Sequence, residues 1–517
     1  LLPEPASDSP HSSRRVERTS HDQTPGAYTP GSPGAAYRLV GVRLTDGREI
    51  PCGAAILCAG TFMRGLLHCG EQKTPGGRHG AEPARGISQL LLSLGFDLRR
   101  LKTGTSARMD RRTIDFSVME AQPGDNPPQP FSFTNEPATF RPRQLDCWLT
   151  RTTPATHQLI LANLHRSPMY AGEIEGTGPR YCPSIEDKVV RFAGRDSHQV
   201  FVEPEGFDTD VTYLAGISTS LPAEVQDEMM RTLPGLERAR ILRHGYAVEY
   251  DFLPAAQVDR GLMTRRIGGF FLAGQILGTS GYEEAAAQGL IAGFNAARYA
   301  AMSPESRDTR WSPFALGREQ AYIGVMIDDL ITKVPVEPYR MFTSRAEHRL
   351  LLRSDNADRR LTPLAEQLGA VPSSRGDAVR ALEADIATAF RTMHSVRKQG
   401  VSLLDELRRP EVTLAALIDR EPALQALQLS PRVREQVEID AKYEGYLKIQ
   451  SANVARQARL EHQRIPRDFD FSGVKNLGTE ARQKLSTVRP DSVGQAQRIA
   501  GVNPSDIAVL LLALATT

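Results

Sequence analysis

The chain has 517 residues, a length that predicts roughly two to four domains. Its 63 Lys and Arg residues nearly balance its 61 Asp and Glu residues, giving a net charge of +2 at pH 7. This balance excludes a uniformly basic nucleic-acid-binding protein but leaves room for a locally basic face. With 40% hydrophobic and 24% charged residues, the composition is that of an ordinary globular protein with enough apolar material for a core.

The cysteines and the apolar runs exclude several further classes of protein. No C-x-x-C pair occurs, which argues against a zinc ribbon or a disulfide framework and indicates a reducing compartment. The adjacent carboxylates Asp328 and Asp329 lack further ligands, so no metal site is expected. The longest uncharged apolar stretch, 507–517, is about half as long as the roughly 20 residues that a membrane helix needs, so no membrane contact is expected.

The first hundred residues predict a disordered segment followed by short strands. Residues 1–36 are rich in Ser, Pro, Gly, His and Arg and are expected to be disordered. Residues 37–50 predict two strands around an Asp46-Gly47 turn. The apolar run 54–60 ends in glycine and is typical of a buried parallel strand, and a short helix is expected over 88–95.

Residues 97–250 are denser in Pro, Thr, Arg and aromatic residues and predict an irregular mixed region inserted into a larger fold, with a strand over 199–203. The run 268–274 repeats the pattern of a buried strand followed by glycine, and an Ala-rich helix is expected over 283–298. We expect Gly289 and Gly293, four residues apart, to let this helix lie close against a sheet.

Beyond residue 305 the pattern is almost wholly helical. Helices are expected over 361–368, 378–396 and 431–464 from their 3.6-residue spacing of apolar positions. A last helix begins after Asn503, whose side chain suits an N-cap, with Pro504 at the first helical position. The sequence therefore predicts a carboxy-terminal helical domain.

The two glycine-terminated runs, 56–61 and 271–275, form a candidate cofactor site. A glycine at a strand end adds no side chain, so a cofactor can approach the backbone there. The second run is followed, across 278–281, by the N-terminus of the Ala-rich helix, whose unpaired N–H groups suit a phosphate or the electron-rich edge of a flavin ring. An ordinary α/β turn explains the same pattern, and no G-x-G-x-x-G loop precedes a helix anywhere in the chain.

Cys182 is the cysteine whose surroundings favour reactivity. Prolines on both sides predict a rigid turn, and Arg180 and Lys188 nearby would favour the thiolate. A buried structural cysteine explains the same pattern about equally well. The other cysteines in or beside predicted strands, which are expected to serve as packing residues, are Cys52, Cys58 and Cys69.

The densest basic cluster lies at 99–112. Nucleic-acid phosphate, cofactor phosphate and a merely solvated loop all explain it. The candidates for a nucleic-acid contact in this cluster are Arg100, Lys102 and Arg108, although spacing alone favours the solvated loop. A second block at 337–347 combines aromatic and Arg side chains that suit RNA or a protein partner.

Eight strings resemble the MnmG (GidA) family of tRNA uridine 5-carboxymethylaminomethyl modification enzymes. They occur in order between about residues 37 and 515, and their length and order make the resemblance specific. The strings are GPRYCPSIEDK (178–188), EPEG (203–206), GISTSLP (216–222), YEEAAAQG (282–289), YIGVMIDDL (322–330), EPYRMFTSRAE (337–347), DNADRRL (355–361) and KYEGY (442–446).

The resemblance implies an α/β flavoprotein: a Rossmann-like FAD domain, here incomplete, with an inserted mixed α/β domain and a carboxy-terminal all-helical domain. The implied domains are an atypical segment at 1–36, the FAD domain at 37–96 and 251–304, a substrate- and NAD-binding insertion at 97–250, and a helical domain for tRNA and MnmE at 305–517.

The implied activity is the addition of a carboxymethylaminomethyl group to carbon 5 of the wobble uridine of tRNA, position 34, together with the GTPase MnmE. FAD and NADH are the implied cofactors, and methylenetetrahydrofolate is the implied one-carbon donor. The resemblance further implies a homodimer that forms a heterotetramer with MnmE, in the bacterial cytoplasm or, for a eukaryotic protein, in the mitochondrion.

The implied site residues follow from matching positions. Cys182 is the implied catalytic residue, because carbon 5 of a uridine becomes nucleophilic only after a thiolate adds to carbon 6. The implied FAD-contacting residues are Gly60, Gly274, Gln275 and Gly281. The implied NAD-binding stretch comprises Gly178, Pro179, Arg180, Tyr181, Cys182, Pro183, Ser184, Ile185, Glu186, Asp187, Lys188, Val189, Val190, Arg191 and Phe192.

The chain also departs from the family pattern. Ala84 stands where the family has serine, Ser106-Ala107 where it has Pro-Pro, and Leu277 where it has Asn. We expect that an amino-terminal part, with a G-x-G-x-x-G loop and the family's second cysteine, is missing from this chain. Three alternatives stay open. The first is a non-catalytic tRNA- and MnmE-binding fragment unable to hold FAD, and the second is a folate-dependent tRNA methyltransferase of the TrmFO kind, against which the helical tail argues. The third is a generic flavin oxidoreductase acting on a small substrate, which leaves the helical domain unexplained.

Overall fold

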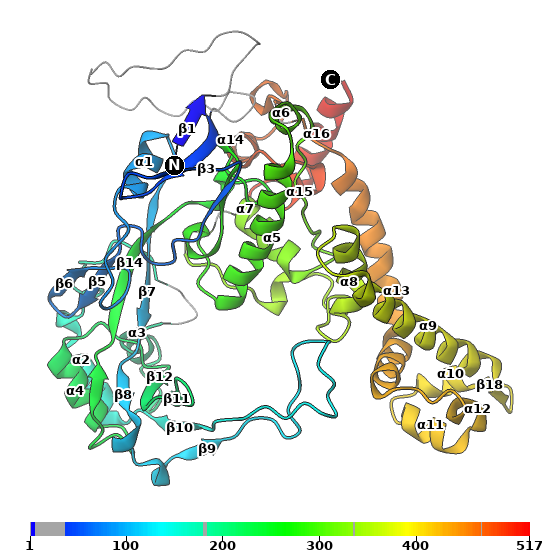
Figure 1. The fold of residues 1–517 in the computed structure, drawn as a ribbon, viewed down its shortest axis with the longest axis horizontal. Helices are drawn as coiled ribbons and strands as arrows, with labels where there is room; N and C mark the ends of the chain where they lie inside the picture. The colour runs from blue at the N-terminus through cyan, green and yellow to red at the C-terminus, as the bar shows by residue number, and fades with distance from the viewer. Residues whose placement is uncertain are drawn as a thin grey trace. The chain divides into compact units, whose positions relative to one another are not determined.

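The computed structural model describes residues 2–5, 37–178, 183–333, 335, 337–466 and 468–516. The chain divides into two compact units. The first unit comprises Leu1–Phe314 and Asp329–Arg340, and the second comprises Ala315–Asp328 and Met341–Thr517. Figure 1 shows strands concentrated in the first unit and helices in the second. None of the described helices combines the length and apolarity needed to cross a bilayer.

Two small sheets carry the glycine-ended strands of the first unit. The first sheet has the order β1-β2-β15 with β3 on β2, and the second pairs β16 with β4 in parallel. The bounds are β1 (Leu2–Pro5), β2 (Tyr37–Arg43), β3 (Glu49–Pro51), β15 (Ile267–Gly268), β4 (Ala55–Leu57) and β16 (Phe270–Leu272). The turn predicted at Asp46-Gly47 is confirmed, since it joins β2 to the antiparallel β3. The Ala-rich helix α5 (Tyr282–Ala301) packs on β16 and β4.

Two expectations about these strands are wrong. Residues 2–5, expected to be disordered, form β1 against β2, because backbone pairing needs no apolar sequence; residues 6–36 lie outside the described part of the chain. The strand β4, expected to be buried, leaves Ile56 38% exposed. Among the described residues, β4 pairs only with β16, so its second edge has no neighbouring strand to cover it.

A four-stranded antiparallel sheet follows in the order β6-β5-β14-β7. Its bounds are β6 (Gln72–Pro75), β5 (Leu66–Cys69), β14 (Tyr246–Phe252) and β7 (Arg99–Thr105). A helix predicted over 88–95 is confirmed as α1 (Ile87–Ser93). The β7–β14 ladder runs from Thr105 opposite Tyr246 to Arg99 opposite Phe252, so it brackets the segment between them.

That bracketed segment is better ordered than its sequence suggested. It forms a six-stranded antiparallel sheet of order β13-β8-β12-β11-β10-β9, not irregular structure. The strands are β8 (Arg108–Asp110), β9 (Glu120–Gln122), β10 (Cys147–Arg151), β11 (Gln199–Pro204), β12 (Val211–Ala215) and β13 (Ile241–Arg243), with helices α2 (Pro154–Ala162), α3 (Ile185–Arg191) and α4 (Ala223–Arg231). Half of these strands have only three residues, too few for an alternating pattern to stand out in the sequence.

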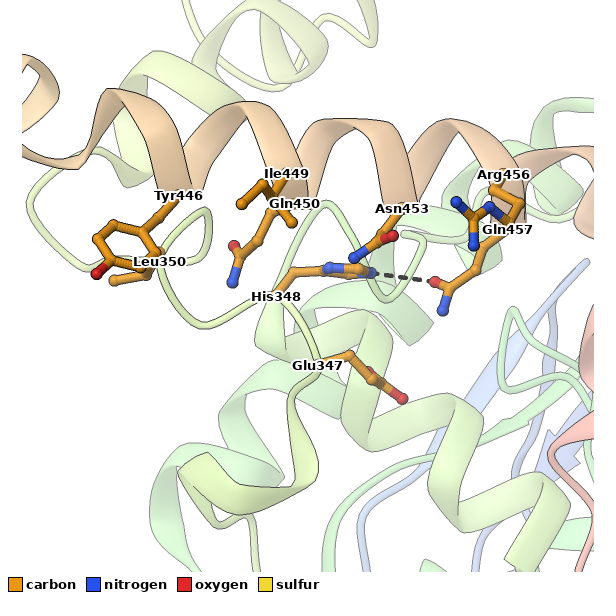
Figure 2. Close-up of a pocket in the computed structure, with 9 residues that line it drawn as sticks. All are labelled: Glu347, His348, Leu350, Tyr446, Ile449, Gln450, Asn453, Arg456 and Gln457. Atoms are coloured by element: carbon orange, nitrogen blue, oxygen red, sulfur yellow. Dashed lines mark hydrogen bonds between the residues drawn. The ribbon is translucent and has the colours of Figure 1, made fainter.

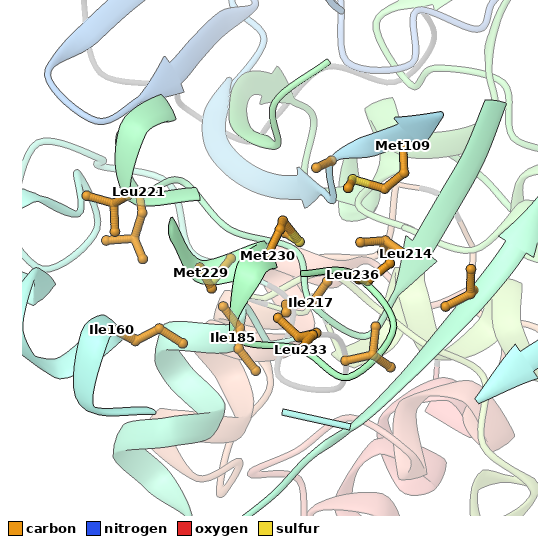
Figure 3. Close-up of a cluster of buried hydrophobic side chains, with 14 of the residues drawn as sticks. Met109, Ile160, Ile185, Leu214, Ile217, Leu221, Met229, Met230, Leu233 and Leu236 are labelled. Atoms are coloured by element: carbon orange, nitrogen blue, oxygen red, sulfur yellow. The ribbon is translucent and has the colours of Figure 1, made fainter. Parts of the chain in front are cut away.

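The helices and the sheet of this segment share one apolar core, shown in Figure 3. Met109 of β8 and Leu214 of β12 are fully buried in it, as are Ile160 of α2, Ile185 of α3 and Met229 of α4. Five elements scattered over about 120 residues of sequence therefore converge on one cluster, which is the arrangement of an independent layered domain.

The predicted carboxy-terminal helices are confirmed. The helices after α5 are α6 (Pro304–Arg310), α7 (Tyr322–Lys333), α8 (Ala357–Gln367), α9 (Ser373–Ser395), α10 (Leu403–Leu407), α11 (Leu414–Arg420), α12 (Pro422–Gln425), α13 (Pro431–His462), α14 (Thr479–Val488), α15 (Val493–Gln497) and α16 (Pro504–Thr516), with a hairpin of β17 (Arg397–Lys398) and β18 (Val401–Ser402). The short 3₁₀ helices are η1 (Arg111–Thr113), η2 (Phe116–Val118), η3 (Leu164–Arg166), η4 (Ala255–Gln257), η5 (Gly274–Leu277), η6 (Thr343–Arg345) and η7 (Phe471–Gly473).

Side-chain caps start α13 and α16 of the second unit. Asn503 Oδ1 accepts hydrogen bonds from the backbone N–H groups of Ser505 and Asp506, as its sequence position predicted. Ser430 caps α13 in the same way by accepting from Val433 N at 3.3 Å. The first turns of α13 bury Val433 and Val437 against α9–α12.

The buried ion pairs of the second unit tie its last helices to α7. Arg498, at the end of α15, donates to both carboxylate oxygens of Asp328, at 2.7 and 2.9 Å. Asp328 is 2% exposed and also accepts from Arg318. Asp328 is therefore engaged in ion pairs, and a metal-binding role is not needed to explain it. Among the described residues, no group of His, Cys, Asp or Glu side chains has the arrangement of a metal site.

The role expected of Gly289 and Gly293 is wrong. A Cβ atom added at either position would meet no other atom within 4 Å. The face of α5 that packs on the sheet carries Ile291, Ala292 and Tyr299 instead, all of them buried. The two glycines lie beside that face, so four-residue spacing alone did not identify the packed side.

The glycine environments predict opposite effects for three helical Gly→Ala substitutions. Gly289→Ala in α5 and Gly445→Ala in α13 add a methyl group to open space, and should raise the free energy of unfolding by up to about 1 kcal/mol. Gly324→Ala in α7 would place its Cβ against the carbonyl oxygens of Leu316 and Gly317, so it should lower stability by about 1–3 kcal/mol. Urea unfolding of each variant measures this, and a destabilised Gly289→Ala variant would contradict the packing described above.

Candidate cofactor and substrate site

The parallel pairing of β4 with β16 brings the two glycine-ended runs together. Ala55, Ile56 and Leu57 lie opposite Phe270, Phe271 and Leu272 in register. Past the strand ends, Gly60 and Gly274 both have positive φ, +55° and +87°, which glycine adopts without strain. A Cβ at Gly60 would lie 3.7 Å from Gln275 Oε1. Residues predicted as FAD contacts from two distant segments are thus neighbours.

Gln288 fixes the backbone of this strand end, and the sequence did not single it out. Its fully buried side chain on α5 accepts a hydrogen bond from Gly274 N at 2.7 Å and donates to Thr279 Oγ1 at 3.0 Å. The amide therefore joins the turn before the helix to the helix itself. Gln288 stands in the string YEEAAAQG, and a polar residue on the inward face of an Ala-rich helix was the available signal.

Tyr250 is a second residue that the sequence did not indicate. It lies on β14 and is fully buried, and its hydroxyl has no hydrogen bond of ordinary geometry. Burial raises the pKa of Tyr250, while the neighbouring Gln275 side chain partly offsets this rise. Apart from this contact with Tyr250, no hydrogen bond joins the Gln275 amide to another described residue. A buried phenol and an amide with unused hydrogen-bonding capacity therefore lie together at the end of β16.

The N-terminus of α5 is already covered by a carboxylate. Gly281 is the N-cap residue, and a Cβ there would overlap the carboxylate of Glu284, which folds back over it. The two acidic residues of the first turn, Glu283 and Glu284, repel a phosphate at this helix end. A phosphate is therefore disfavoured at this helix end, and the role of Gly281 in contacting FAD stays a prediction.

Glu249 on β14 anchors the segment that leads into the implied NAD-binding stretch. Its Oε1 accepts from the backbone N–H groups of Glu175 and Gly176, at 2.9 and 2.7 Å. Arg100 Nη2 lies 3.1 Å from Glu249 Oε2, and His68 Nε2 lies 3.6 Å from the same oxygen, beyond hydrogen-bond distance. Glu249 is 4% exposed, so this carboxylate orders a loop from inside the sheet.

The stretch 178–192 is described except for Pro179, Arg180, Tyr181 and Cys182, so the implied catalytic cysteine lies outside the described residues. Gly178 packs against Lys102, where a Cβ would come within 2.5 Å of Lys102 Cε. Ser184 caps α3 by accepting from Asp187 N.

Most described side chains of this stretch have structural contacts. The Glu186 carboxylate is fully buried and accepts from Thr219 Oγ1 and from Ser220 N. Lys188 Nζ donates to Gly216 O at 2.6 Å. Phe192, at the end of α3, is 49% exposed and so remains accessible to a ligand. The role of the stretch in binding NAD stays a prediction.

The basic residues predicted to contact tRNA are engaged within the protein. Arg100 forms ion pairs with Glu249 and Asp251, and its side chain is 15% exposed. Lys102 is 6% exposed. Arg108 donates to Glu205 Oε1 at 2.7 Å, and its guanidinium lies over the Tyr213 ring. Their role in binding tRNA stays a prediction. The ion pairs, burial and ring contact described above differ from the solvent-exposed surroundings expected of a solvated loop.

One cysteine differs from its expected role. Cys58, expected to be a packing residue, is exposed just after β4, whereas Cys52, Cys69 and Cys147 are partly buried. The difference has the same cause as the exposure of Ile56, because β4 is uncovered on one side. Partial burial still raises the pKa of the Cys58 thiol, so nothing in its surroundings favours a thiolate.

The second unit has a groove along α13, shown in Figure 2. Six of its lining residues come from one stretch of α13, and the others, including His348, follow η6. His348 Nε2 lies 3.1 Å from Gln457 Oε1, which joins the two walls. Tyr446 and Ile449 are each 63% exposed beside it. The groove measures about 410 Å³ and combines apolar and polar side chains, as a surface for a macromolecular partner does.

Comparison with family models matches three stretches of the chain, one before and two after residues 305–377. The model named Glucose inhibited division protein A matches residues 33–304. The models named tRNA modifying enzyme MnmG/GidA C-terminal helical domain and C-terminal helical bundle match residues 378–451 and 453–517.

Individual relatives show the same similarity. The tRNA uridine 5-carboxymethylaminomethyl modification enzyme MnmG of Protochlamydia amoebophila is 48% identical over 480 residues, covering 92% of this chain and 75% of the relative. MnmG of Thermus thermophilus is 50% identical over 477 residues, covering 92% and 78%. The crystal structure of Aquifex aeolicus GidA in its form I crystal superposes with a TM-score of 0.83 at 44% identity, covering 92% of this chain and 78% of that one.

The anchoring of residues 175–176 predicts a pH-dependent stability. Burial alone would raise the pKa of Glu249, but the nearby His68 and Arg100 side chains lower it from 4.5 to about 2. A depressed carboxylate pKa contributes stability above the unfolded pKa and loses it as the pH falls toward the folded pKa. The free-energy gap between wild type and Glu249→Gln should therefore be at most about 3 kcal/mol at neutral pH, and should shrink from pH about 4.5 downward.

Urea unfolding at a series of pH values measures this gap. The exposed Glu283→Gln serves as control and should show no comparable gap. A constant difference between wild type and Glu249→Gln across the acidic range would contradict the ion-pair assignment.

The Gln288 contacts predict a local loss of stability. Gln288→Leu leaves Gly274 N–H and Thr279 Oγ1 buried without this partner, and should lower the free energy of unfolding by about 1–3 kcal/mol. The same change at Gln199, exposed on β11, should have little effect. Thermal unfolding followed by circular dichroism compares the two, and equal stabilities would show that Gln288 does not hold the turn.

Proposed function

The chain belongs to the MnmG (GidA) family, and from this premise we propose that it modifies carbon 5 of the wobble uridine of tRNA. The observation that carries the proposal is the match of three family models along the chain together with about half of the residues identical to relatives named MnmG. The product is the carboxymethylaminomethyl group of those relatives' name. The proposed reaction uses FAD, NADH and methylenetetrahydrofolate, with the GTPase MnmE as partner.

The residues at the ends of β4 and β16 fit a flavin. Gly60 and Gly274 leave the backbone open to a flat ring, because neither carries a Cβ. The Gln275 amide can both donate and accept, and the buried Tyr250 hydroxyl lacks a partner of ordinary geometry. A flavin ring presents carbonyl and N–H groups along one edge, which these side chains would complement. When bound, the flavin supplies the redox chemistry and the one-carbon transfer.

The chain's own contribution to the reaction is nucleophilic and acid–base chemistry. The Cys182 thiolate adds to carbon 6 of the uridine, which makes carbon 5 nucleophilic; the thiol proton must first be removed. After carbon 5 has formed its new bond, its proton is removed and the cysteine leaves carbon 6. Glu249 supports this chemistry from a distance, since it orders residues 175 and 176 just before the cysteine-bearing stretch.

The helical unit is the proposed surface for tRNA and MnmE. Support comes from the exposed aromatic and basic side chains of α13, where Tyr446 and Ile449 lie toward one end of the groove of Figure 2 and Arg456 toward the other. Aromatic side chains stack on unpaired bases and Arg side chains contact phosphates. A homodimer that assembles with MnmE into a heterotetramer completes the proposal, and the bacterial relatives favour the cytoplasm.

A second candidate function is a tRNA- and MnmE-binding fragment that holds no FAD. The absence of a G-x-G-x-x-G sequence from the chain favours it, because this loop usually binds the pyrophosphate of FAD. The Glu284 carboxylate over the start of α5 also leaves no phosphate site at that helix. The visible absorbance of the purified chain separates the two functions, since a stoichiometric flavin band excludes the second.

The proposed mechanism predicts a selective effect of Cys182→Ser. Modified wobble uridine should disappear, because serine cannot form a comparable nucleophile at neutral pH, while flavin content is unchanged. Cys147→Ser, a substitution of a partly buried cysteine on β10, should retain both properties. Mass spectrometry of nucleosides from tRNA incubated with each protein, MnmE and the cofactors measures the product. Normal modification by the Cys182→Ser protein would contradict the proposed role.

A further inference from the structure

A second groove of the helical unit is lined by several charged side chains. It measures about 670 Å³ and lies among α8, α9 and α13. Its apolar lining includes Leu351, Ile386 and Phe390. Its charged lining residues are the cations Arg353, Arg359, Arg360 and Lys448 and the carboxylates Glu383, Asp440 and Glu444.

Every carboxylate of this lining is already neutralised by a cation. Arg359 donates to Asp440 at 2.8 Å and forms an ion pair with Glu383 at 2.5 Å. Arg353 binds the other oxygen of Asp440 at 3.1 Å. The carboxylate of Glu444 lies 2.6 Å from Lys448 Nζ and also contacts Arg408. Of the four lining cations, three are therefore paired within the groove.

Arg360 is the fourth lining cation, and it takes no part in the ion pairs described above. Its guanidinium donates to Asn356 Oδ1 at 2.9 Å, to Arg353 O at 3.1 Å and to Gln320 O, all of them neutral acceptors. Two of its five N–H groups have no acceptor among the described residues, and no described carboxylate lies within 4 Å of it. Burial and the neighbouring Arg353 lower the pKa of Arg360, and the more distant Asp355 offsets only part of this lowering.

The protein nevertheless holds this guanidinium in a fixed position. Asn356, 9% exposed at the N-cap of α8, accepts from Arg360 and donates to Leu351 O at 3.2 Å, so its orientation is set. The positive end of the α8 dipole lies at the same turn. Asp358, the acidic residue of that turn, is bound to Arg432 at 2.6 Å and is not among the partners of Arg360. A half-buried, oriented guanidinium whose direct acceptors are all neutral retains the capacity to bind an anion.

We propose that Arg360 is the anchor of a phosphate-binding site in this groove, which its remaining N–H groups complete by donating to a phosphate oxygen. Arginine suits this task because its planar fork of donors matches phosphate geometry. The phosphate belongs either to the backbone of an RNA or to a free phosphate ion. The RNA source rests on the proposed function, whereas the site itself rests on the contacts described above.

The RNA arm of the test measures the affinity of the chain for RNA as a function of salt concentration. The full chain is titrated into a fluorescent RNA stem-loop, and fluorescence anisotropy gives Kd at several KCl concentrations. Arg360→Gln should weaken binding by about 5- to 10-fold and reduce the slope of log K against log salt by about one, the loss of one phosphate contact. The control Arg380→Gln removes an exposed Arg of the same unit that is paired with Glu366 and Asp377, and should change neither quantity.

The free-phosphate arm uses thermal unfolding in potassium phosphate against potassium chloride of equal ionic strength. A stabilising shift in wild type that Arg360→Gln lacks supports the site, whether or not the RNA arm changes. If Arg360→Gln loses only the thermal shift in phosphate, the ligand is a free phosphate ion. If Arg360→Gln also binds the RNA more weakly, the ligand is a phosphate of the RNA backbone. Wild-type behaviour of Arg360→Gln in both arms overturns the proposal.

A conservative variant covers the case in which Arg360→Gln does not fold. Arg360→Lys keeps the charge but not the fork, so RNA binding should weaken a few-fold with an unchanged salt slope. Unchanged affinity in this variant, together with an unchanged phosphate shift, overturns the proposal. A failure of the proposed function would appear separately, as absent uridine modification while the phosphate arm still responds to Arg360.

Discussion

The parallel pairing of β4 with β16 is the constraint on which the first unit depends. It joins residues 55–57 to residues 270–272, so the whole intervening chain must leave and return to the same place. Within this intervening segment, β7 pairs with β14. The residues between β7 and β14 form the six-stranded sheet, which packs around its own core. Because the strand ends meet only through this pairing, Gly60 and Gln275 become neighbours across about 200 residues of sequence.

Features encoded locally could be predicted from the sequence. The glycine-ended runs, the α5 helix and the Asn503 cap need only nearby residues, and each is present in the structure. Features that depend on distant partners could not be predicted. Gln288 and Tyr250 acquire their positions only when α5 and β14 pack beside β16, and no local pattern reports that packing. The three-residue strands of the six-stranded sheet were missed for a related reason, since their order comes from neighbours in space.

Several arginines of the described residues form ion pairs within the protein. Arg100 and Arg108, which looked in the sequence like a basic cluster, neutralise carboxylates of their own sheets. Arg498 and Arg318 do the same for Asp328 in the helical unit. Arg360 differs from these four arginines, because its hydrogen-bond acceptors are neutral. The interaction partners of each guanidinium therefore indicate ligand binding better than a count of basic residues does.

We propose that the ends of β4 and β16 bind a flavin. Titration of the chain with FAD is the direct test of this binding. Quenching of flavin fluorescence gives Kd for wild type and for Gln275→Leu, with circular dichroism to show that both are folded. We expect saturable FAD binding by wild type and about tenfold weaker FAD binding by Gln275→Leu, because the variant loses one hydrogen-bonding group. Equal FAD affinity of the two folded proteins, or no binding by wild type, would contradict it.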